Sequence, residues 1–448
     1  MSVRTLRSGL ILLLLGALVV GLSGCSSLGK KKNKNRLEGK RISVMTLQSG
    51  LTADPRLADV QVRLPQPYTN ADWPLVAGYP THAMQHLELA QTLSTKWRTS
   101  VGTGSGGNVR LVAPPVVAGG VIYVFDAKSN VSATRAVTGK RLWRVAVRSK
   151  KKKERKEQGF GGGIGVAGER VFVSSGVGFV VALDVADGSE IWRTEIGLPL
   201  RGSPTIADGR VFVITNDNQL YALDEKTGEN LWSHVGIAEN AEMMGAASPA
   251  VIGDVVVVAY SSGELFALRV ENGRVAWTDS LTRTGRMTPL SSLNDIDGSP
   301  VVYHGRVYAI SHSGRMVAID LRSGARVWER NVAGVQTPWI AGDFIYIVTV
   351  QGNVVCLSAR SGRVRWVTPL QRFKNIKKKK GAIRWAGPVL AGDRLVVVSS
   401  HGYVVSLSPY DGKPLGAAKL SSSVFLSPIV ADDTLYILTD KAQLYALR

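Results

Sequence analysis

Two histidines offer the first candidate chemistry in this chain. His82 and His86 are four residues apart, the spacing at which two zinc ligands share one face of a helix. A metalloprotease with this spacing uses a glutamate directly after the first histidine as its general base, and this chain has Ala83 there. We therefore interpret both residues as surface or packing histidines and predict no metal site.

Two other patterns are typical of ligand sites but incomplete. The segment Gly161–Gly165 is rich in glycine, yet an apolar strand pattern follows it instead of a helix, so a phosphate cradle is not expected. Asp295 and Asp297 offer carboxylates to calcium, but the glutamate that ends a helical calcium-binding loop is missing. With no convincing pair of nucleophile and base, the sequence predicts a protein that is not an enzyme and has no cofactor.

The elements that must position any site form a repeat. Seven tryptophans recur along the chain, and in six cases a glycine precedes the tryptophan by four positions. The fullest copies read Ala-x-Asp-x-x-x-Gly-x-x-x-Trp, as in Ala182 to Trp192. A repeat of roughly 40 to 50 residues is typical of the blades of a β-propeller. The seven are Trp97, Trp143, Trp192, Trp232, Trp277, Trp328 and Trp366.

The copy at residues 202–232 predicts four short antiparallel strands. Its apolar and β-branched residues alternate with polar ones, and turns rich in glycine, asparagine and aspartate separate the runs. Gly228 lies in the turn before the fourth strand, where a positive φ is expected. Trp232 then lies on the outermost strand and packs against the neighbouring blade.

Together the copies predict an all-β fold, an eight-bladed β-propeller of four-stranded antiparallel blades. One fourth strand carries Gly412 with Gly416 in place of tryptophan, and the last repeat stops at Arg448 after three strands. The strand around Trp97 has no preceding strands, so it is expected to complete the last blade and close the ring. The alternative is seven blades, with the repeat at 160–192 distorted. First strands begin at Pro114, Ile164, Ser203, Ser248, Ser299, Thr337, Gly387 and Ser427.

The N-terminus is typical of an export signal. A basic start and the apolar run Leu10–Val20 lead to Leu-Ser-Gly-Cys, which resembles a bacterial lipoprotein signal. We expect residues 1–24 to be removed and Cys25 to receive fatty acyl chains such as palmitate, which anchor a protein stably when several are present. Ser26, in place of aspartate, is consistent with transfer to the outer membrane. The alternative is an uncleaved anchor with an incidental cysteine.

The rest of the chain divides into three predicted segments. Residues 25–69 are expected to form a lipid-anchored flexible tether, 70–95 an extended N-terminal arm, and 96–448 the propeller. Cys356, the only other cysteine, replaces the small alanine of the repeat and is expected to be a buried hydrophobic residue without an internal disulfide.

The chain is strongly basic, with a net charge of +21. Much of this charge lies in the runs Lys30–Arg36, Lys150–Lys156 and Arg372–Lys380. Export argues against binding to nucleic acid. The first run lies next to the expected lipid anchor and is able to contact anionic head groups. For the other two, solvated loops without a partner are an equally good interpretation.

The connections between a fourth strand and the next first strand vary most in length. In an antiparallel blade they all emerge on one face, which is the predicted working surface because function usually resides in variable loops on a regular scaffold. These connections include residues 144–163, 233–247, 278–298 and 367–386.

The tryptophan repeat resembles that of pyrroloquinoline-quinone-type propellers. A lipoprotein with eight such blades is similar to the BamB family, outer-membrane protein assembly factors that work with the BamA insertase. Leu198–Pro204 resembles the Leu-x-Leu-Arg-Gly loop of this family, and the segment 295–297 resembles its Asp-x-Asp loop. The resemblance implies that both loops lie on the propeller face that docks on the periplasmic POTRA domains of BamA. It assigns partner contact to Leu198, Leu200, Arg201, Asp295 and Asp297.

Physical chemistry is compatible with such an interface. Two exposed leucines would supply apolar anchors, and Arg201 a charged donor of the kind enriched in hot spots. Alternatively, Asp295 and Asp297 hold Arg201 in place, and Leu198 and Leu200 pack under the loop.

The resemblance implies a non-enzymatic subunit anchored in the outer membrane and facing the periplasm. Its implied partners are a BamA-like insertase, other assembly lipoproteins and outer-membrane protein precursors. Two rival functions stay open. One is a quinoprotein dehydrogenase with quinone and calcium at the propeller centre, and the other is a propeller that binds an anionic surface or glycan.

Overall fold

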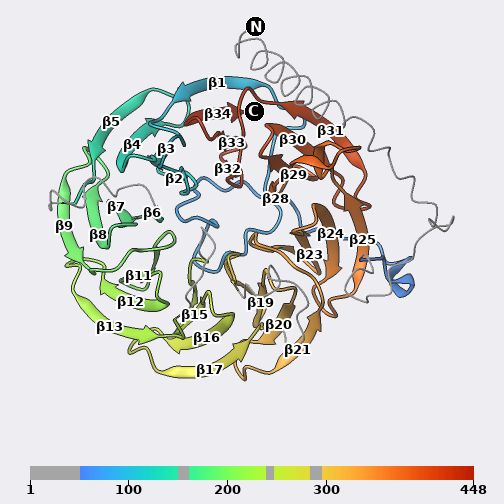
Figure 1. Cartoon of the computed structure of the whole chain (residues 1–448), viewed down its shortest axis with the longest axis horizontal. Coiled ribbons are helices and arrows are strands. Elements are labelled where there is room, and N and C mark those ends of the chain that lie inside the picture. The colour runs from blue at the N-terminus through green and yellow to red at the C-terminus, as the bar shows by residue number, and fades with distance from the viewer. Residues whose placement is uncertain (1–50, 150–160, 239–246, 283–294) are drawn as a thin grey trace, which may run out of the picture. The chain divides into compact units, whose positions relative to one another are not determined.

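Eight four-stranded antiparallel sheets surround a central axis and form an eight-bladed β-propeller (Figure 1). A computed structural model describes residues 51–149, 161–238, 247–282 and 295–448. The chain divides into two units, 1–50 and 51–448, and all described residues belong to the second. The prediction of eight blades is confirmed, and the alternative of seven is wrong because β6–β9 form a complete blade.

Each blade runs from an innermost first strand to a fourth strand on the perimeter. Blades 1 to 4 comprise β2 Val116–Ala118, β3 Val121–Phe125, β4 Asn130–Arg135 and β5 Arg141–Ala146; β6 Gly162–Ala167, β7 Arg170–Ser175, β8 Phe179–Asp184 and β9 Glu190–Glu195; β10 Thr205–Ala207, β11 Arg210–Ile214, β12 Gln219–Asp224 and β13 Asn230–Val235; and β14 Ala250–Ile252, β15 Val255–Ala259, β16 Glu264–Arg269 and β17 Val275–Ser280.

Blades 5 to 8 follow the same order, and a small hairpin lies between blades 6 and 7. They comprise β18 Val301–Tyr303, β19 Arg306–Ile310, β20 Met316–Asp320 and β21 Arg326–Arg330; β22 Trp339–Ala341, β23 Phe344–Val348, β24 Asn353–Ser358 and β25 Val364–Pro369; the hairpin β26 Phe373–Asn375 and β27 Lys380–Ala382; β28 Trp385–Ala391, β29 Arg394–Ser399, β30 Tyr403–Leu407 and β31 Pro414–Lys419; and β32 Ile429–Ala431, β33 Thr434–Leu438, β34 Gln443–Leu447 and β1 Thr95–Ser100.

The tryptophan of each repeat docks on the glycine turn of the next blade. Trp192 of blade 2 lies against Gly228 of blade 3, whose φ of +77° and lack of a side chain leave room for the indole. A Cβ at Gly228 would lie 2.5 Å from Cε3 of Trp192. The indole Nε1 also donates a hydrogen bond to the Glu225 carbonyl at 3.1 Å. The spacing of glycine and tryptophan is therefore a docking device between neighbouring blades.

All seven tryptophans make this indole hydrogen bond, at 2.7 to 3.1 Å. The accepting carbonyls belong to Ala136, Val185, Glu225, Val270, Leu321, Ala359 and Pro409.

The boundary between blades 7 and 8 is built differently. Blade 7 has Gly416 in place of tryptophan, and all residues of its fourth strand β31 are exposed. In blade 8, β34 and β1 come from opposite ends of the chain, so the described residues 429–448 and 95–100 contain no glycine turn to receive an indole. The missing tryptophan and the missing glycine thus belong to the same boundary.

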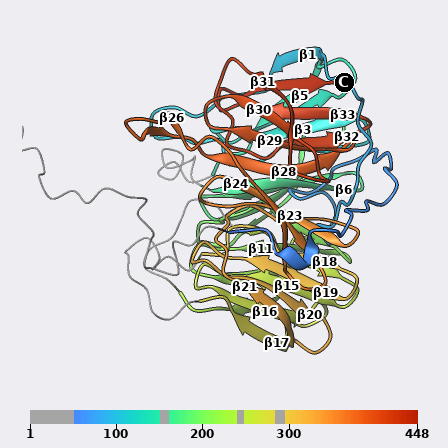
Figure 2. The ribbon, with the colours of Figure 1, turned by 90° about the vertical axis from the view of Figure 1, so that its right-hand side faces the viewer.

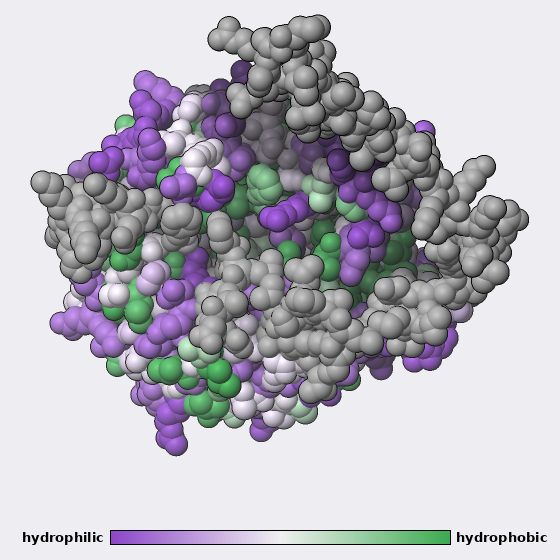
Figure 3. All heavy atoms as spheres, viewed as in Figure 1, coloured by the Kyte–Doolittle hydropathy of each residue, from purple (hydrophilic) through white to green (hydrophobic). Residues whose placement is uncertain are grey.

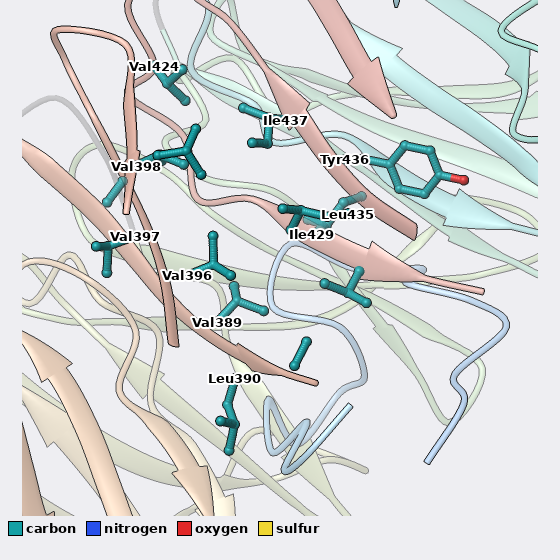
Figure 4. Packing of buried hydrophobic residues seen from close by; sticks show 14 of the residues in the cluster. Val389, Leu390, Val396, Val397, Val398, Val424, Ile429, Leu435, Tyr436 and Ile437 are labelled. Atoms are coloured by element: carbon teal, nitrogen blue, oxygen red, sulfur yellow. The ribbon is translucent and has the colours of Figure 1, made fainter. Parts of the chain in front are cut away.

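Aliphatic packing joins the inner strands of blades 7 and 8. Val389 and Val396 of blade 7 and Ile429, Leu435 and Ile437 of blade 8 belong to one buried cluster (Figure 4). Burying such side chains stabilises the fold by about 1.5 to 3 kcal/mol each. Packing near the axis therefore joins the two blades where no tryptophan docks on the perimeter.

An N-terminal strand closes the ring, as predicted. β1 pairs antiparallel with β34, with Trp97 opposite Ala446 and Ser100 opposite Gln443. Trp97 then docks on Gly139 of blade 1, where a Cβ would lie 2.8 Å from its indole.

The propeller has two distinct faces, which lie at opposite sides in Figure 2. One carries the connections between fourth strands and following first strands, including the hairpin β26–β27, and we call it the loop face. The other carries the turns between first and second strands and the N-terminal arm, and we call it the arm face.

The arm traces a smaller ring at the innermost strands (Figure 1), contacting the blades in order. Its contacts on these strands and the turns after them are Asn70 with Val430 and Asp432 in blade 8, Trp73 with Val117 in blade 1, Pro74 with Val166 in blade 2, Leu75 beside Ile206 in blade 3, Pro80 with Val251 in blade 4, Thr81 with Val302 in blade 5, Gln85 with Trp339 in blade 6, and Leu87 with Leu390 and Gly392 in blade 7. Tyr68 then pairs with Leu87 and bridges the start and end of this ring.

The chain before the arm also packs on the propeller. The amide of Asp54 donates to the Val364 carbonyl at 2.8 Å, and Arg365 donates to the Val60 carbonyl at 2.8 Å. Residues 51–69, which belong to the predicted tether, are therefore held against blade 6 and the arm, whereas residues 25–50 lie outside the described residues.

Candidate functional site

The two loops assigned to partner contact come together on the loop face. The loop Ile196–Pro204 leads from blade 2 into β10 of blade 3, and residues 295–300 lead into β18 of blade 5. Nη2 of Arg201 in the first loop lies 3.6 Å from Oδ1 of Asp295 in the second. Side chains almost a hundred positions apart in the sequence thus meet on the loop face.

This ion pair is almost completely buried. The side chain of Arg201 is 8% exposed and that of Asp295 is 2% exposed. The backbone amide of Arg201 donates to the Ile214 carbonyl at 3.0 Å, and the Asp295 carbonyl accepts from the His312 amide at 2.9 Å. The backbone of each partner is therefore fixed to a blade, and the contact is compatible with the interpretation that Asp295 holds Arg201 in place.

Leu200 corrects the expectation of two exposed leucines. It is only 1% exposed and packs in a buried cluster with Phe172 and Ile206. Its amide donates to the Ser175 carbonyl at 3.2 Å, and it forms an isolated bridge with Thr215. Because these backbone contacts draw the loop between blades 2 and 3, the side chain points into the protein and is not available as a surface anchor.

Leu198 remains accessible in part. It is half-buried, and the following Pro199 is exposed. The amides of Ile196 and Gly197 donate to the Gly178 carbonyl at 2.8 and 2.9 Å, which holds the loop close to blade 2. Gly178 has a φ of +94°, and a Cβ there would lie 2.9 Å from the backbone of Leu198. Leu198 is therefore presented by a fixed backbone.

Asp297 is also half-buried and lies in a tightly packed loop. A Cβ at the following Gly298 would lie 2.5 Å from the Gln336 carbonyl oxygen. The Ser299 amide donates to Oγ1 of Thr337 at 3.1 Å, which joins this loop to the start of blade 6. Asp297 is thus held by a rigid backbone.

Two exposed apolar residues near this site were not singled out from the sequence. Val235 is 63% exposed and Ile237 is 61% exposed. The turn of blade 3 connects them to the Leu198 loop, since the Asn218 side chain donates to the Ile237 carbonyl and the Asn216 amide to the Pro199 carbonyl. The outward positions of the alternating pattern in β13 would have identified Val235.

Apolar side chains gather over blades 3 and 4 in the space-filling view of the loop face, toward the lower left (Figure 3). Hydrophilic side chains dominate the upper part of the same face where it is not covered by residues drawn in grey. An apolar patch with a polar rim is typical of a protein-binding surface.

The histidine pair serves to pack the arm. His82 and His86 are 4% and 2% exposed, and His82 has a φ of +61°, which is not helical. Nδ1 of His82 donates to the Pro300 carbonyl at 2.7 Å, and burial lowers the pKa of His82 to about 4. Among the described residues, no group of three or more His, Cys, Asp or Glu side chains is placed to hold a metal ion.

Cys356 is fully buried and free, as predicted. It lies opposite Tyr346 and Trp366 on the neighbouring strands, and burial raises the pKa of its thiol well above the ordinary value.

Three expectations concern residues outside the described ranges. These are the acylation of Cys25 and the basic runs Lys30–Arg36 and Lys150–Lys156. Within the described ranges, no helix combines the length and apolar character needed to cross a membrane.

Comparisons with known proteins agree with the repeat. A family model described as "Outer membrane protein assembly factor BamB" matches residues 45–159, 127–368 and 370–448. The outer membrane protein assembly factor BamB of Salmonella typhimurium is 31% identical over 371 residues, covering 81% of this chain and 91% of the relative.

Solved structures share the fold. The crystal structure of BamB from Moraxella catarrhalis aligns with a TM-score of 0.67 and 20% identity, covering 80% of this chain and all of the other. A europium-containing methanol dehydrogenase aligns with a TM-score of 0.65 and 15% identity, covering 82% of this chain and 89% of the other. At such identities the likeness concerns the fold alone. The family model and the sequence relative, in contrast, cover most of the chain, which therefore belongs to the BamB family of outer membrane protein assembly factors.

Proposed function

We propose that this chain is a non-enzymatic lipoprotein subunit of the machinery that assembles β-barrel proteins into the outer membrane. Acyl chains on Cys25 anchor it to that membrane on the periplasmic side, and its loop face docks on the POTRA domains of a BamA-like insertase. Other assembly lipoproteins and outer-membrane protein precursors are further proposed partners. The observation that supports this best is the meeting of the two loops through Arg201 and Asp295 on the loop face.

Within this proposal the five loop residues have two different roles. Leu198 and Asp297 are half-buried, so they are available to contact the partner directly. Leu200, Arg201 and Asp295 are buried, so they act by holding the two loops at a fixed separation. Preorganised loops bind more tightly because less conformational entropy is lost on docking.

The apolar part of the surface extends beyond the family motifs. Val235 and Ile237 are exposed on the same face and linked to the Leu198 loop through the turn of blade 3. Apolar residues at the centre of an interface, surrounded by polar ones, contribute most of the binding free energy. We therefore place the centre of the proposed docking surface over blades 3 and 4.

Co-purification with the insertase from detergent-solubilised membranes tests the proposed surface. Leu198→Glu introduces a charge that must be desolvated on docking, so we expect at least a tenfold loss of co-purified insertase, about 1.4 kcal/mol or more. The matched control is Val137→Glu on the arm face, where the replaced side chain is 78% exposed. Thermal unfolding verifies that both variants are folded. Undiminished co-purification of Leu198→Glu would sink the assignment of this surface.

A second pair of variants separates contact from loop positioning. Arg201→Ala removes the buried ion pair, so we expect both the melting temperature and the amount of co-purified insertase to decrease. Leu198→Glu is expected to lower only co-purification. If Arg201→Ala lowered the melting temperature but left co-purification intact, loop positioning would not matter for docking.

A further inference from the structure

The hairpin between blades 6 and 7 carries the highest density of positive charge among the described residues. Residues 372–384 contain seven basic side chains and no acidic one. All seven are exposed, and the hairpin labelled β26 projects from the loop face in Figure 2. The seven are Arg372, Lys374, Lys377, Lys378, Lys379, Lys380 and Arg384.

The base of this hairpin is firmly attached to the propeller. Nε1 of Trp385 donates to the Gln371 carbonyl at 3.0 Å, and the Ile383 amide donates to the Arg372 carbonyl at 2.9 Å. Trp385 is 9% exposed and Ile383 is 8% exposed, so both anchor the hairpin in the core. An isolated two-stranded hairpin is only marginally stable, and this buried base supports the small sheet.

The tip combines charge with an exposed apolar side chain. Phe373 pairs with Ala382 and Asn375 with Lys380, and the turn between them begins at Ile376. Ile376 is 70% exposed and is followed by four lysines. The Lys378 amide donates to Oδ1 of Asn375 at 2.9 Å, so the turn is ordered by its own hydrogen bond.

We propose that this hairpin tip binds anionic phospholipid head groups, with Ile376 entering the head-group layer and the lysines contacting phosphates. Each basic residue near an anionic membrane surface strengthens binding several-fold, so the loss of a few lysines is measurable as a change in lipid affinity. Ile376 adds apolar burial of the kind that inserts shallowly at the boundary between head groups and acyl chains.

The composition of the tip favours a lipid over a protein ligand. Lysine is depleted at protein interfaces, and a stable protein interface buries about 800 Å² on each partner. Two strands of three residues offer a small convex surface instead. The lysine ammonium is a point charge on a flexible side chain, and it suits mobile phosphate groups because no fixed bidentate geometry is required.

The position of the hairpin is compatible with attachment of the N-terminus to the same membrane. Leu51 and Asp54 pack on blade 6, and the hairpin emerges from the fourth strand of that blade. The residues 26–50 between Cys25 and Leu51 span at most roughly 85 Å when extended. The acylation of Cys25 belongs to the proposed function, but binding by the hairpin does not require it.

Fluorescence at the tip tests this inference in the mature chain, residues 25–448, with Cys25→Ser so that no acyl chain contributes. Ile376→Cys carries an environment-sensitive fluorophore, and the fully buried Cys356 stays unlabelled. Vesicles contain either phosphatidylcholine alone or an equal mixture with phosphatidylglycerol. We expect a blue-shifted, stronger emission only with phosphatidylglycerol, and reversal at high salt because screening weakens the attraction.

Two matched variants make the result specific. Changing Lys377–Lys380 to glutamine in the labelled chain is expected to raise the lipid concentration needed for half of the emission change at least about 100-fold, whereas arginine at these positions preserves it. A fluorophore on Val137→Cys, 78% exposed on the arm face, is expected to show no change.

Other results would overturn the proposal. These are equal changes at positions 376 and 137, equal changes with both lipid compositions, no change with vesicles, or a change with polyglutamate but not with vesicles, which would indicate an acidic protein ligand. Because position 25 is serine throughout, failure of the proposed lipid anchor leaves this measurement unaffected.

Discussion

The arm face and the loop face use the same eight blades in opposite ways. On the arm face, one segment contacts every blade in order, mostly through backbone hydrogen bonds to the innermost strands. On the loop face, each connection between blades has its own length, and the best-defined link between blades 3 and 5 is one buried ion pair. Regular backbone pairing on one face thus leaves the other face free to carry specific contacts.

The difference predicts that variants on the two faces have different effects. Changes on the arm face should lower the stability of the ring and leave the docking surface unchanged. Changes on the loop face should alter docking, whether or not they also lower stability. Four substitutions test this contrast.

The largest loss of stability is expected for Trp73→Ala on the arm face. Trp73 is 2% exposed and stacks on Trp339, with ring centroids 6.1 Å apart. Its removal leaves a large cavity, which costs about 3 to 5 kcal/mol. Urea unfolding measures the loss, and Tyr79→Ala, 38% exposed in the same arm, is the control. Equal losses for both variants would contradict a central role of the packed arm.

Acid should weaken the arm face through His82. In the unfolded chain this histidine has the ordinary pKa of 6.5, whereas burial lowers its pKa to about 4 in the folded protein. The unfolded state therefore binds a proton first as the pH falls, and the free energy of unfolding decreases between about pH 6.5 and 4, by about 3 kcal/mol in total.

Comparison with His82→Gln isolates this contribution, because all other groups titrate in both proteins. The difference in free energy of unfolding between them should change with pH only in this window. A difference that is independent of pH would show that His82 is not buried in its neutral form.

Arg201→Ala tests the loop face and should cost about 2 kcal/mol. The variant leaves Asp295 buried without the Arg201 guanidinium. Because the two groups are 3.6 Å apart, we expect a smaller loss of stability than for a tightly hydrogen-bonded buried ion pair. A double-mutant cycle with Asp295→Ala measures the coupling between the two side chains. Additive effects would mean that the ion pair does not join the loops energetically.

The smallest effect is expected for Asn70→Ala, about 1 kcal/mol. Its side-chain amide donates to the Val430 carbonyl at 2.7 Å in a buried position, and a lost hydrogen bond of this kind has a modest net cost. Thermal unfolding measures it, with Thr69→Ala at a neighbouring exposed position as the control. Neither variant should change co-purification with the insertase.

The blades were predictable from the sequence because their signature is local. The glycine of the turn and the tryptophan of the next strand are four residues apart, so each copy of the repeat is recognisable from its own short segment of sequence. The closure was predictable for a related reason, since the unfinished repeat at Arg448 and the isolated strand at Trp97 complete each other.

The burial of the site residues was not predictable in the same way. Leu200 is buried because Ser175 and Thr215, on two different blades, hold its backbone. The path of the arm has the same origin, since its backbone hydrogen bonds join residues that are far apart in the sequence, such as Asn70 and Asp432. Such contacts depend on the assembled ring and leave no periodic pattern in the chain.

The split blade 8 has a consequence for biosynthesis. Its outer strand is made more than 300 residues before its three inner strands, so β1 has no partner until Gln443–Leu447 have been synthesised. A chain truncated before that point would expose the unpaired edge of β1 and leave Val389 and Val396 of blade 7 without the side chains of blade 8. Exposed strand edges and apolar surface are what chaperones and proteases recognise, so copies in which the ring has not closed are easy to remove.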